Sequence, residues 1–426
     1  MDDRLPTGPW VDDAPVVSDW TAGLRRAGLE RFQALGFPTT RDEAWKYTNL
    51  APLARGGFRV GREAQAAPAG IAERWGLGGA RVVIVDGHFD RGASRLGVGA
   101  GARLVPLGLA LAEHRELVEP LLGACAPEGD AMASLNQAHL GDGLVLHVQA
   151  GVDLEEPIVV LHVGLGAGIV SHPRTLIALE TGARARVVEV WVTEGQGARA
   201  SNAVTEVSLA DGATLEHCSV GAEGPDALRT AALFARVGRS ATLRSGSYAF
   251  GAGLGRAEVS VTLGEGAECD LSGLTLVGGK RHADVRTFVD HAAPHGTSRQ
   301  TFKGIAGGAG RTVFNGRVLV RPGAQKTDAR QSSQNLLLSE RAWADTRPQL
   351  EIFADDVKCA HGATVGQLDE EALFYLRARG IGATEAQALL TEAFAGEVLD
   401  SCPTEALRPT LRAVLSERLT TGEEMP

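Results

Sequence analysis

The segments TGARARVVEVWVT (residues 181–193) and DGATLEHCSV (residues 211–220) share one pattern, a glycine-containing turn that leads into a run of β-branched and aliphatic residues. Such runs between turn residues are typical of short β-strands. The turn or a close variant recurs at 26- to 31-residue spacings, at Gly151, Gly182, Gly212, Ser240, Gly266, Gly296 and Gly323. This repeat predicts a β-solenoid, in which each coil buries its inner face by stacking on its neighbours. A large β-sandwich with regularly spaced hairpins is the alternative.

The strand pattern is flanked by segments of different character. Upstream, we expect a helix that begins at Ser18 and ends at Gly36, a strand over residues 80–85 and a helix over residues 104–122. We therefore divide the chain into an N-terminal helical or mixed domain (1–139), a parallel β-helix core (140–358) and a C-terminal helical domain (359–426).

Three short amphipathic helices are expected at the C-terminal end. Asp369 is a good N-cap for the first, and Thr384 with Gln387 forms a capping box for the second. The third is expected from about Thr410. Helices in this position either close the open end of the solenoid or dock a partner.

Composition restricts the possible functions. The net charge of −10, without a block of Lys and Arg, argues against nucleic acid or an anionic membrane as the main partner. Five scattered cysteines without a CxxC motif are typical of a reduced, cytoplasmic protein. The longest apolar run, residues 157–170, is too short to span a bilayer. No Walker A motif occurs, so we do not expect ATP hydrolysis by this chain alone.

Cys359 and His361 are the best candidates for a functional site. If the strand predicted at residues 349–353 continues, positions i and i+2 point to the same face. A thiolate beside an imidazole suits iron, zinc or copper(I). Because two donors do not complete a coordination sphere, a metal would need further ligands, such as those of a second chain. The alternative is that both residues are structural.

Several ordered strings carry a family resemblance: DTRPQLEI (345–352), DDVKCAHGATVG (355–366) and LFYLRARGI (373–381), supported by VFNG (313–316), KTDA (326–329), NLLL (335–338) and RDEAWKYT (41–48). Together they resemble the SufB/SufD family of iron–sulfur cluster assembly proteins, and within it the SufD proteins most. The strongest part covers residues 285–400.

The resemblance implies a mainly β protein, a right-handed parallel β-helix between helical termini. It implies a non-enzymatic subunit of the SUF (SufBCD) scaffold complex that pairs with SufB and takes part in nascent cluster formation and iron acquisition. His361, with Cys359 beside it, is implied at the SufB interface, where iron or a transient cluster is shared and none is held stably by this chain alone. The SufC ATPase is implied to bind the C-terminal helices, for which we single out Phe374, Tyr375, Leu376, Arg379 and Phe394.

Two other function classes stay open. A polysaccharide-active β-helix enzyme would use paired carboxylates with aromatic platforms, and an aromatic content of 5% speaks against it. A purely structural adaptor would need neither Cys359 nor His361. A homodimer of the isolated chain is also possible, because the edges of an open solenoid invite strand pairing.

Overall fold

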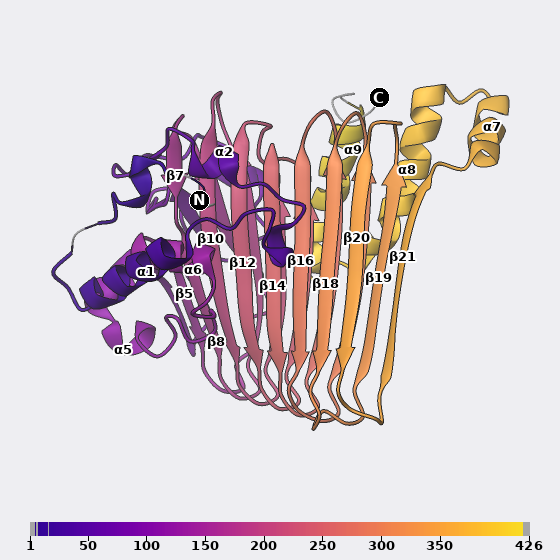
Figure 1. Cartoon of the computed structure of the whole chain (residues 1–426). Coiled ribbons are helices and arrows are strands. Elements are labelled where there is room, and N and C mark those ends of the chain that lie inside the picture. Colours follow the sequence, from indigo (N-terminus) through magenta and orange to yellow (C-terminus); the bar gives the residue numbers. More distant parts are fainter. Residues whose placement is uncertain (1–4, 6, 16, 421–426) are drawn as a thin grey trace.

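The computed structural model describes residues 5, 7–15 and 17–420. The protein is mainly β, with 40% strand, 22% helix and a β-solenoid of about eight turns (Figure 1). Its long strands pair in parallel with the strand one coil away, as β10 does with β12. The predicted solenoid is therefore confirmed, and the sandwich built from hairpins is wrong.

The solenoid has two sheets, and each coil contributes one strand to each sheet (Figure 1). The strands of the first sheet are β4 (Ala102–Pro106), β5 (Gly143–Val148), β8 (Arg174–Leu179), β10 (Arg199–Leu209), β12 (Ala227–Val237), β14 (Leu254–Leu263), β16 (His282–His291), β18 (Arg311–Val320) and β20 (Trp343–Ile352), with β7 (Ile169–Ser171) beside β10 and β1 (Arg59–Val60) beside β7. Those of the second are β3 (His88–Phe89), β2 (Arg81–Val85), β6 (Ile158–Gly164), β9 (Arg184–Thr193), β11 (Thr214–Gly221), β13 (Thr242–Ala249), β15 (Glu268–Val277), β17 (Thr297–Ala306), β19 (Asp328–Leu337) and β21 (Lys358–Gln367).

The repeating turn forms its own hydrogen-bonded ladder. Gly182 N donates to Asp211 O (3.0 Å), and Gly212 N donates to Arg239 O (2.9 Å) one coil further on. The residue at this position has a positive φ, a conformation that glycine adopts without steric cost. In the later coils the position is held by His295 and Lys326 (φ 63° each), so the predicted turns at Gly296 and Gly323 are wrong in register. The sequence pattern failed there because these residues are not glycine.

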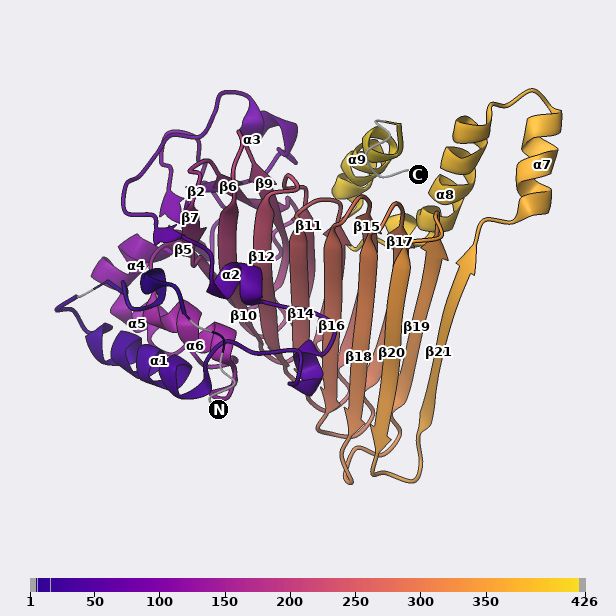
Figure 2. The same cartoon turned by 45° about the horizontal axis from the view of Figure 1, so that its top comes forward.

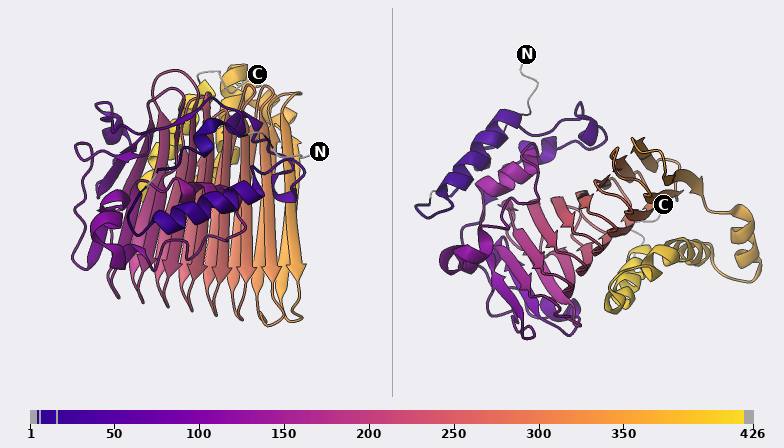
Figure 3. Two further views of the ribbon diagram at one scale, coloured as in Figure 1. Left: turned by 60° about the vertical axis from the view of Figure 1, so that its left-hand side comes forward. Right: turned by 90° about the horizontal axis from the view of Figure 1, so that it is seen from below.

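The solenoid interior is mainly a stack of aliphatic side chains, interrupted by a buried cluster in which Thr175 and Thr205 donate to Glu189. Columns of Leu, Val and Ala run from the N-terminal strands through successive coils, and Leu215 above Leu243 is one such step. The outer face of the second sheet is also apolar and packs against the C-terminal helices. The outer face of the first sheet packs against N-terminal segments. Most of the N-terminal helices therefore lie on the opposite side of the solenoid from the C-terminal helices (Figure 3). The segment over residues 71–74 is the exception, because Arg74 pairs with Glu417 near the C-terminus (2.8 Å).

The N-terminal region mixes helices with strands that extend the solenoid. Its helices are η1 (Pro9–Val11), α1 (Ala22–Leu35), η2 (Glu43–Trp45), α2 (Ala51–Ala54), α3 (Ile71–Arg74), α4 (Leu107–Glu113), α5 (Arg115–Val118) and α6 (Ala131–Ala138). The strand predicted at residues 80–85 is confirmed as β2. The helix expected to begin at Ser18 begins at Ala22. The helix expected over 104–122 is right only in its middle part, which forms α4 and α5. Its start is wrong, because Leu104 pairs with Leu146 in the antiparallel β4–β5 ladder.

The three predicted C-terminal helices are α7 (Glu370–Ala378), α8 (Ala383–Asp400) and α9 (Arg408–Thr420), with η3 (Glu405–Leu407) before the last. Asp369 caps α7 as predicted and accepts from the backbone N–H groups of Glu371 and Ala372. The capping box at Thr384 is wrong, since α8 starts at Ala383 with Gly382 at its N-cap. Helices α8 and α9 lie against the second sheet, whereas α7 projects beyond β21 (Figures 1 and 2). No helix within the described residues is long and apolar enough to cross a membrane.

The open end of the solenoid as a candidate functional site

Cys359 and His361 lie on β21, the last strand of the second sheet. Cys359 pairs in register with Ala329 and His361 with Gln331 on β19. Cys359 is half-buried and packs against the interior core, while His361 is exposed. Since residues i and i+2 of a strand share a face, both side chains lie on the interior side of the sheet, at the mouth of the solenoid. The predicted strand places them side by side, although β20 ends at Ile352 and a separate strand carries them.

The interior below these residues is polar. Gln331 Nε2 donates to Gln300 Oε1 (3.1 Å), which also accepts from Thr287 Oγ1 (2.6 Å). Beside them, Thr346 Oγ1 donates to Ser333 Oγ (2.8 Å) across the two sheets. Buried polar groups cost free energy unless they are hydrogen-bonded, and Gln300 Nε2 and Gln331 Oε1 have no partner among the described residues. This polar lining is therefore less stabilising than an apolar one would be. It makes the mouth of the solenoid hydrophilic on the side that carries His361.

The surroundings of Cys359 favour the protonated form of its thiol. Burial raises its pKa above the usual value, and the carboxylate of Asp328 adds to the increase. A protonated thiol is a weak nucleophile, whereas a bound cation displaces the proton and creates a thiolate ligand. Cys359 therefore suits a metal ligand better than a free nucleophile. Among the described residues no group of three or more His, Cys, Asp or Glu side chains is arranged to hold a metal ion.

Strands β20 and β21 form the edges of their sheets at this end. In the described part of the chain, neither has a strand on its outer side. Large apolar side chains are exposed around the edges: Trp343 (60%), Ile352 (41%), Phe353 (62%) and Val365 (48%). Long, exposed and apolar edges are templates for pairing with another chain, and soluble proteins normally cover or charge them.

The side chains expected to contact an ATPase lie on two different helices. On α7, Phe374 and Tyr375 are 75% and 55% exposed, and the guanidinium of Arg379 lies 3.9 Å from the Tyr375 ring centroid. Leu376 is half-buried. Phe394 on α8 is also half-buried, and its ring contacts Lys303 of β17, so it belongs to the helix–solenoid seam. The exposed aromatic side chains of this set therefore both lie on α7.

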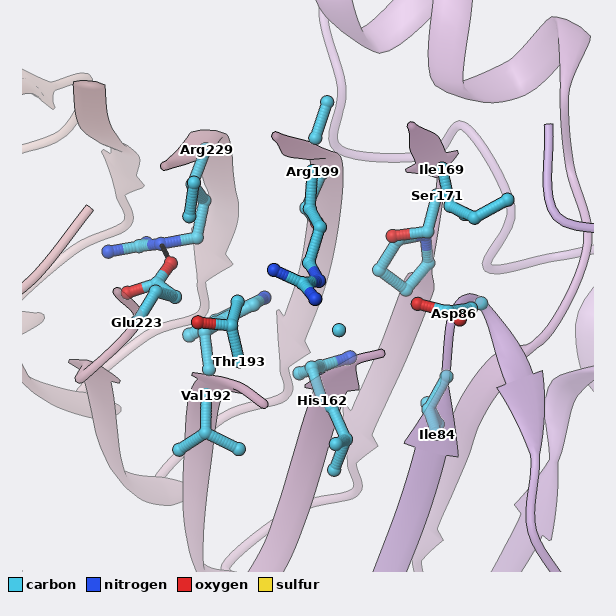
Figure 4. Close-up of a pocket in the computed structure, with 18 of the residues that line it drawn as sticks. Ile84, Asp86, His162, Ile169, Ser171, Val192, Thr193, Arg199, Glu223 and Arg229 are labelled. Atoms are coloured by element: carbon cyan, nitrogen blue, oxygen red, sulfur yellow. Dashed lines mark hydrogen bonds and ion pairs between the residues drawn. The ribbon is translucent and has the colours of Figure 1, made fainter. Parts of the chain in front are cut away.

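A second polar site lies near the N-terminal end, where β2, β6, β9 and β10 surround a cavity of about 40 Å³ (Figure 4). The ring nitrogens of His162 and the indole N–H of Trp191 have no protein partner within the described residues. Burial lowers the pKa of His162 to about 4, so this imidazole is neutral. A buried water needs about 10–15 Å³ measured in this way, so the cavity has room for roughly three waters. It is too small for an iron–sulfur cluster.

The sequence did not predict that two of the cysteines lie next to each other. Cys218 on β11 and Cys402 after α8 are buried with their sulfur atoms 3.7 Å apart. His217 and Cys218 face opposite sides of β11, because His217 approaches Glu189 in the interior while Cys218 meets the C-terminal helices. The docking of α8, which no local pattern encodes, brings the two thiols together.

The chain is thus a two-sheet β-solenoid that carries a cysteine and a histidine on an open sheet edge. Two family models match the chain: the SUF system FeS cluster assembly SufBD core domain over residues 162–394, and the SufBD protein N-terminal region over residues 16–160. The chain belongs to the SufBD family of the SUF system for iron–sulfur cluster assembly.

Curated relatives support this assignment. The iron–sulfur cluster assembly protein SufD of Escherichia coli is 32% identical over 92% of both chains. An iron–sulfur cluster assembly SufBD family protein of Synechocystis is 31% identical over 92% of this chain and 90% of its own length. SufD of Bacillus subtilis is 27% identical over 72% of this chain and 71% of its own length. The predicted likeness to SufD is confirmed.

Proposed function

We propose that this chain is a SufD-type subunit that pairs through β20 and β21 with a paralogous SufB solenoid and offers His361 and Cys359 to a site shared between the two. The observation that carries the proposal is the coincidence of an exposed sheet edge with the two soft ligands. A strand added to β21 continues the sheet and brings donors of the second chain next to the mouth of the solenoid. The shared site then handles iron or a nascent cluster as cargo.

The C-terminal helices have a separate part in this proposal. Helix α7 presents Phe374 and Tyr375 to solvent, and aromatic side chains are common anchors of protein–protein interfaces. We propose that α7, with Leu376 and Arg379, is the main contact for the SufC ATPase and that Phe394 holds α8 in place. The chain itself is non-enzymatic, and ATP hydrolysis belongs to the partner.

Co-expression with the paralogous solenoid and the ATPase tests the pairing. We expect Val365→Lys to prevent recovery of the paralogue, because it places a charge on the pairing edge. Leu109→Lys is the matched control, since Leu109 is similarly exposed (45%) on α4, in the N-terminal region. Recovery of the paralogue with Val365→Lys at the control level would show that β21 is not the interface.

His361→Ala separates the proposal from a purely structural adaptor. His361 is exposed, so the substitution should leave the fold and complex formation intact. We expect the assembled complex to lose most of its capacity to form a cluster, measured by absorbance and iron content after reconstitution. An intact complex with unchanged cluster formation would favour the adaptor.

A further inference from the structure

The seam between the C-terminal helices and the solenoid contains two thiols that no part of the proposed function uses. Cys218 Sγ lies 3.7 Å from Cys402 Sγ and 3.6 Å from Thr404 Oγ1. Both cysteines are fully buried, and they are 184 residues apart in the chain. The remaining cysteines have other surroundings: Cys125 contacts Val207 O, and Cys269 and Cys359 contact the solenoid interior.

We propose that Cys218 and Cys402 form a reversible disulfide under peroxide, and that this bond locks the C-terminal helices onto the second sheet. A disulfide has an S–S distance of about 2.05 Å, so the two sulfur atoms must approach by about 1.7 Å. In this proposal, rotation of the two side chains and a small shift of the α8–η3 connection close the gap. Disulfides in reducing compartments are typically transient and regulatory.

Cys402 also lies behind the wall of an open pocket, so a small movement of this wall gives a small oxidant access to its sulfur. The pocket has a volume of about 430 Å³, and its charged lining residues are Arg244, Asp270, Arg299, Glu397 and Arg408. Three guanidinium groups against two carboxylates favour an anionic sulfur on this side. The two sulfur atoms lie within hydrogen-bonding distance of each other. Burial raises the pKa of Cys218 well above the usual value, whereas the contact with Cys218 lowers the pKa of Cys402. Cys402 is therefore the nucleophile, and Cys218 is the resolving thiol.

The reaction balances with hydrogen peroxide as the oxidant. The Cys402 thiolate attacks one peroxide oxygen, the O–O bond breaks, and the sulfenic acid forms as hydroxide leaves. Cys218 then attacks the Cys402 sulfur, its proton goes to the departing hydroxyl group, and water is released. The two thiols lose two electrons together, and the peroxide becomes two waters. A thiol reductant reverses the bond by exchange.

The disulfide would restrict the movement of the C-terminal helices, because Cys218 lies in a central strand while Cys402 follows α8. A covalent bond between them prevents α8 and α9 from leaving the sheet. The redox state of the seam would thereby control the mobility of these helices without any change at Cys359 or His361.

The experiment uses the full chain, titrated with hydrogen peroxide and digested without reduction for mass spectrometry. We expect a linked pair of peptides containing Cys218 and Cys402 that dithiothreitol separates, and at least tenfold slower hydrogen exchange in α8 after oxidation. Cys402→Ser and Cys218→Ser should each abolish the link, and Cys125→Ser should retain it. Oxidation of Cys359 with Cys218 and Cys402 unlinked, or Cys402 in sulfinic form, would overturn the site. Unchanged exchange in α8 would overturn the lock. The wild-type peptide map decides the first point even if a variant fails to fold.

Discussion

Lys303→Met should loosen the docking of α8 without disturbing the solenoid. Lys303 on β17 is buried, and its ammonium donates to Phe394 O (2.9 Å) and Glu397 Oε2 (2.7 Å) while lying 4.7 Å from the Phe394 ring centroid. Methionine keeps the apolar stem of lysine and removes the charge. The substitution therefore tests the polar contacts of the seam separately from its packing.

The expected loss in the free energy of docking is the sum of the contributions of the individual contacts of Lys303. A hydrogen bond from a charged donor contributes about 1.5–3 kcal/mol, and a cation–π contact about 0.5–1 kcal/mol. The contact with Glu397 adds little, because that carboxylate is 69% exposed and screened by water. We expect a loss of about 2–4 kcal/mol in the free energy of docking, which corresponds to roughly 30- to 900-fold faster hydrogen exchange in α8.

A matched control substitution is available in the same C-terminal helices. Arg412 pairs with Asp400, and both side chains are exposed (49% and 67%). Arg412→Gln should therefore cost about 0.2–1 kcal/mol and accelerate exchange by less than about fivefold. Equal effects of the two substitutions, or unchanged α8 exchange with Lys303→Met, would refute the assignment of Lys303 as the anchor.

Three further substitutions probe other parts of the molecule. Glu206→Gln should cost about 3–5 kcal/mol in urea unfolding, because it leaves the buried Arg174 (N–O 2.6 Å) without a counter-charge; a loss below 1 kcal/mol would contradict this. Although burial alone would raise the pKa of Glu206, Arg174 and backbone N–H donors lower it overall. The stabilisation that the Glu206 carboxylate gives the folded state should therefore be complete above about pH 4.5 and decline as the pH falls through the folded-state pKa. The stability of Glu206→Gln should depend less on pH in this range. Phe302→Ala should cost about 3–5 kcal/mol in the same assay, since the ring is buried and stacks 4.8 Å from Phe314; near-wild-type stability would show that the interior collapses around the gap. Phe374→Ala should weaken ATPase binding at least tenfold by calorimetry with an unchanged melting temperature, because the ring is 75% exposed, and unchanged affinity would exclude it from the interface.

The solenoid was predictable because each coil repeats one local signal. A turn residue with positive φ is followed by a strand, and glycine marks the position at Gly182, Gly212 and Gly266. The register failed where His295 and Lys326 adopt the same conformation, since the ladder of turn hydrogen bonds imposes it against local preference. Local capping succeeded at Asp369, whose carboxylate reaches two backbone N–H groups.

The site was predictable in part. The strand alternation that places Cys359 and His361 on one face is local, so the sequence contains it. Their position on an open sheet edge depends on where the last coil ends, which is a property of the whole stack. The pairing of Cys218 with Cys402 was invisible for a related reason, because it needs a helix to dock on a strand 184 residues away.

Backbone hydrogen exchange in β20 and β21, measured with and without the paralogous SufB solenoid, tests the shared edge most directly. If a second chain adds its strands there, the outward amides of Lys358–Gln367 gain partners, and their exchange should slow by at least a hundredfold while that of α1 is unchanged. Exchange in β21 at the same rate with and without a stably bound paralogue would contradict the account.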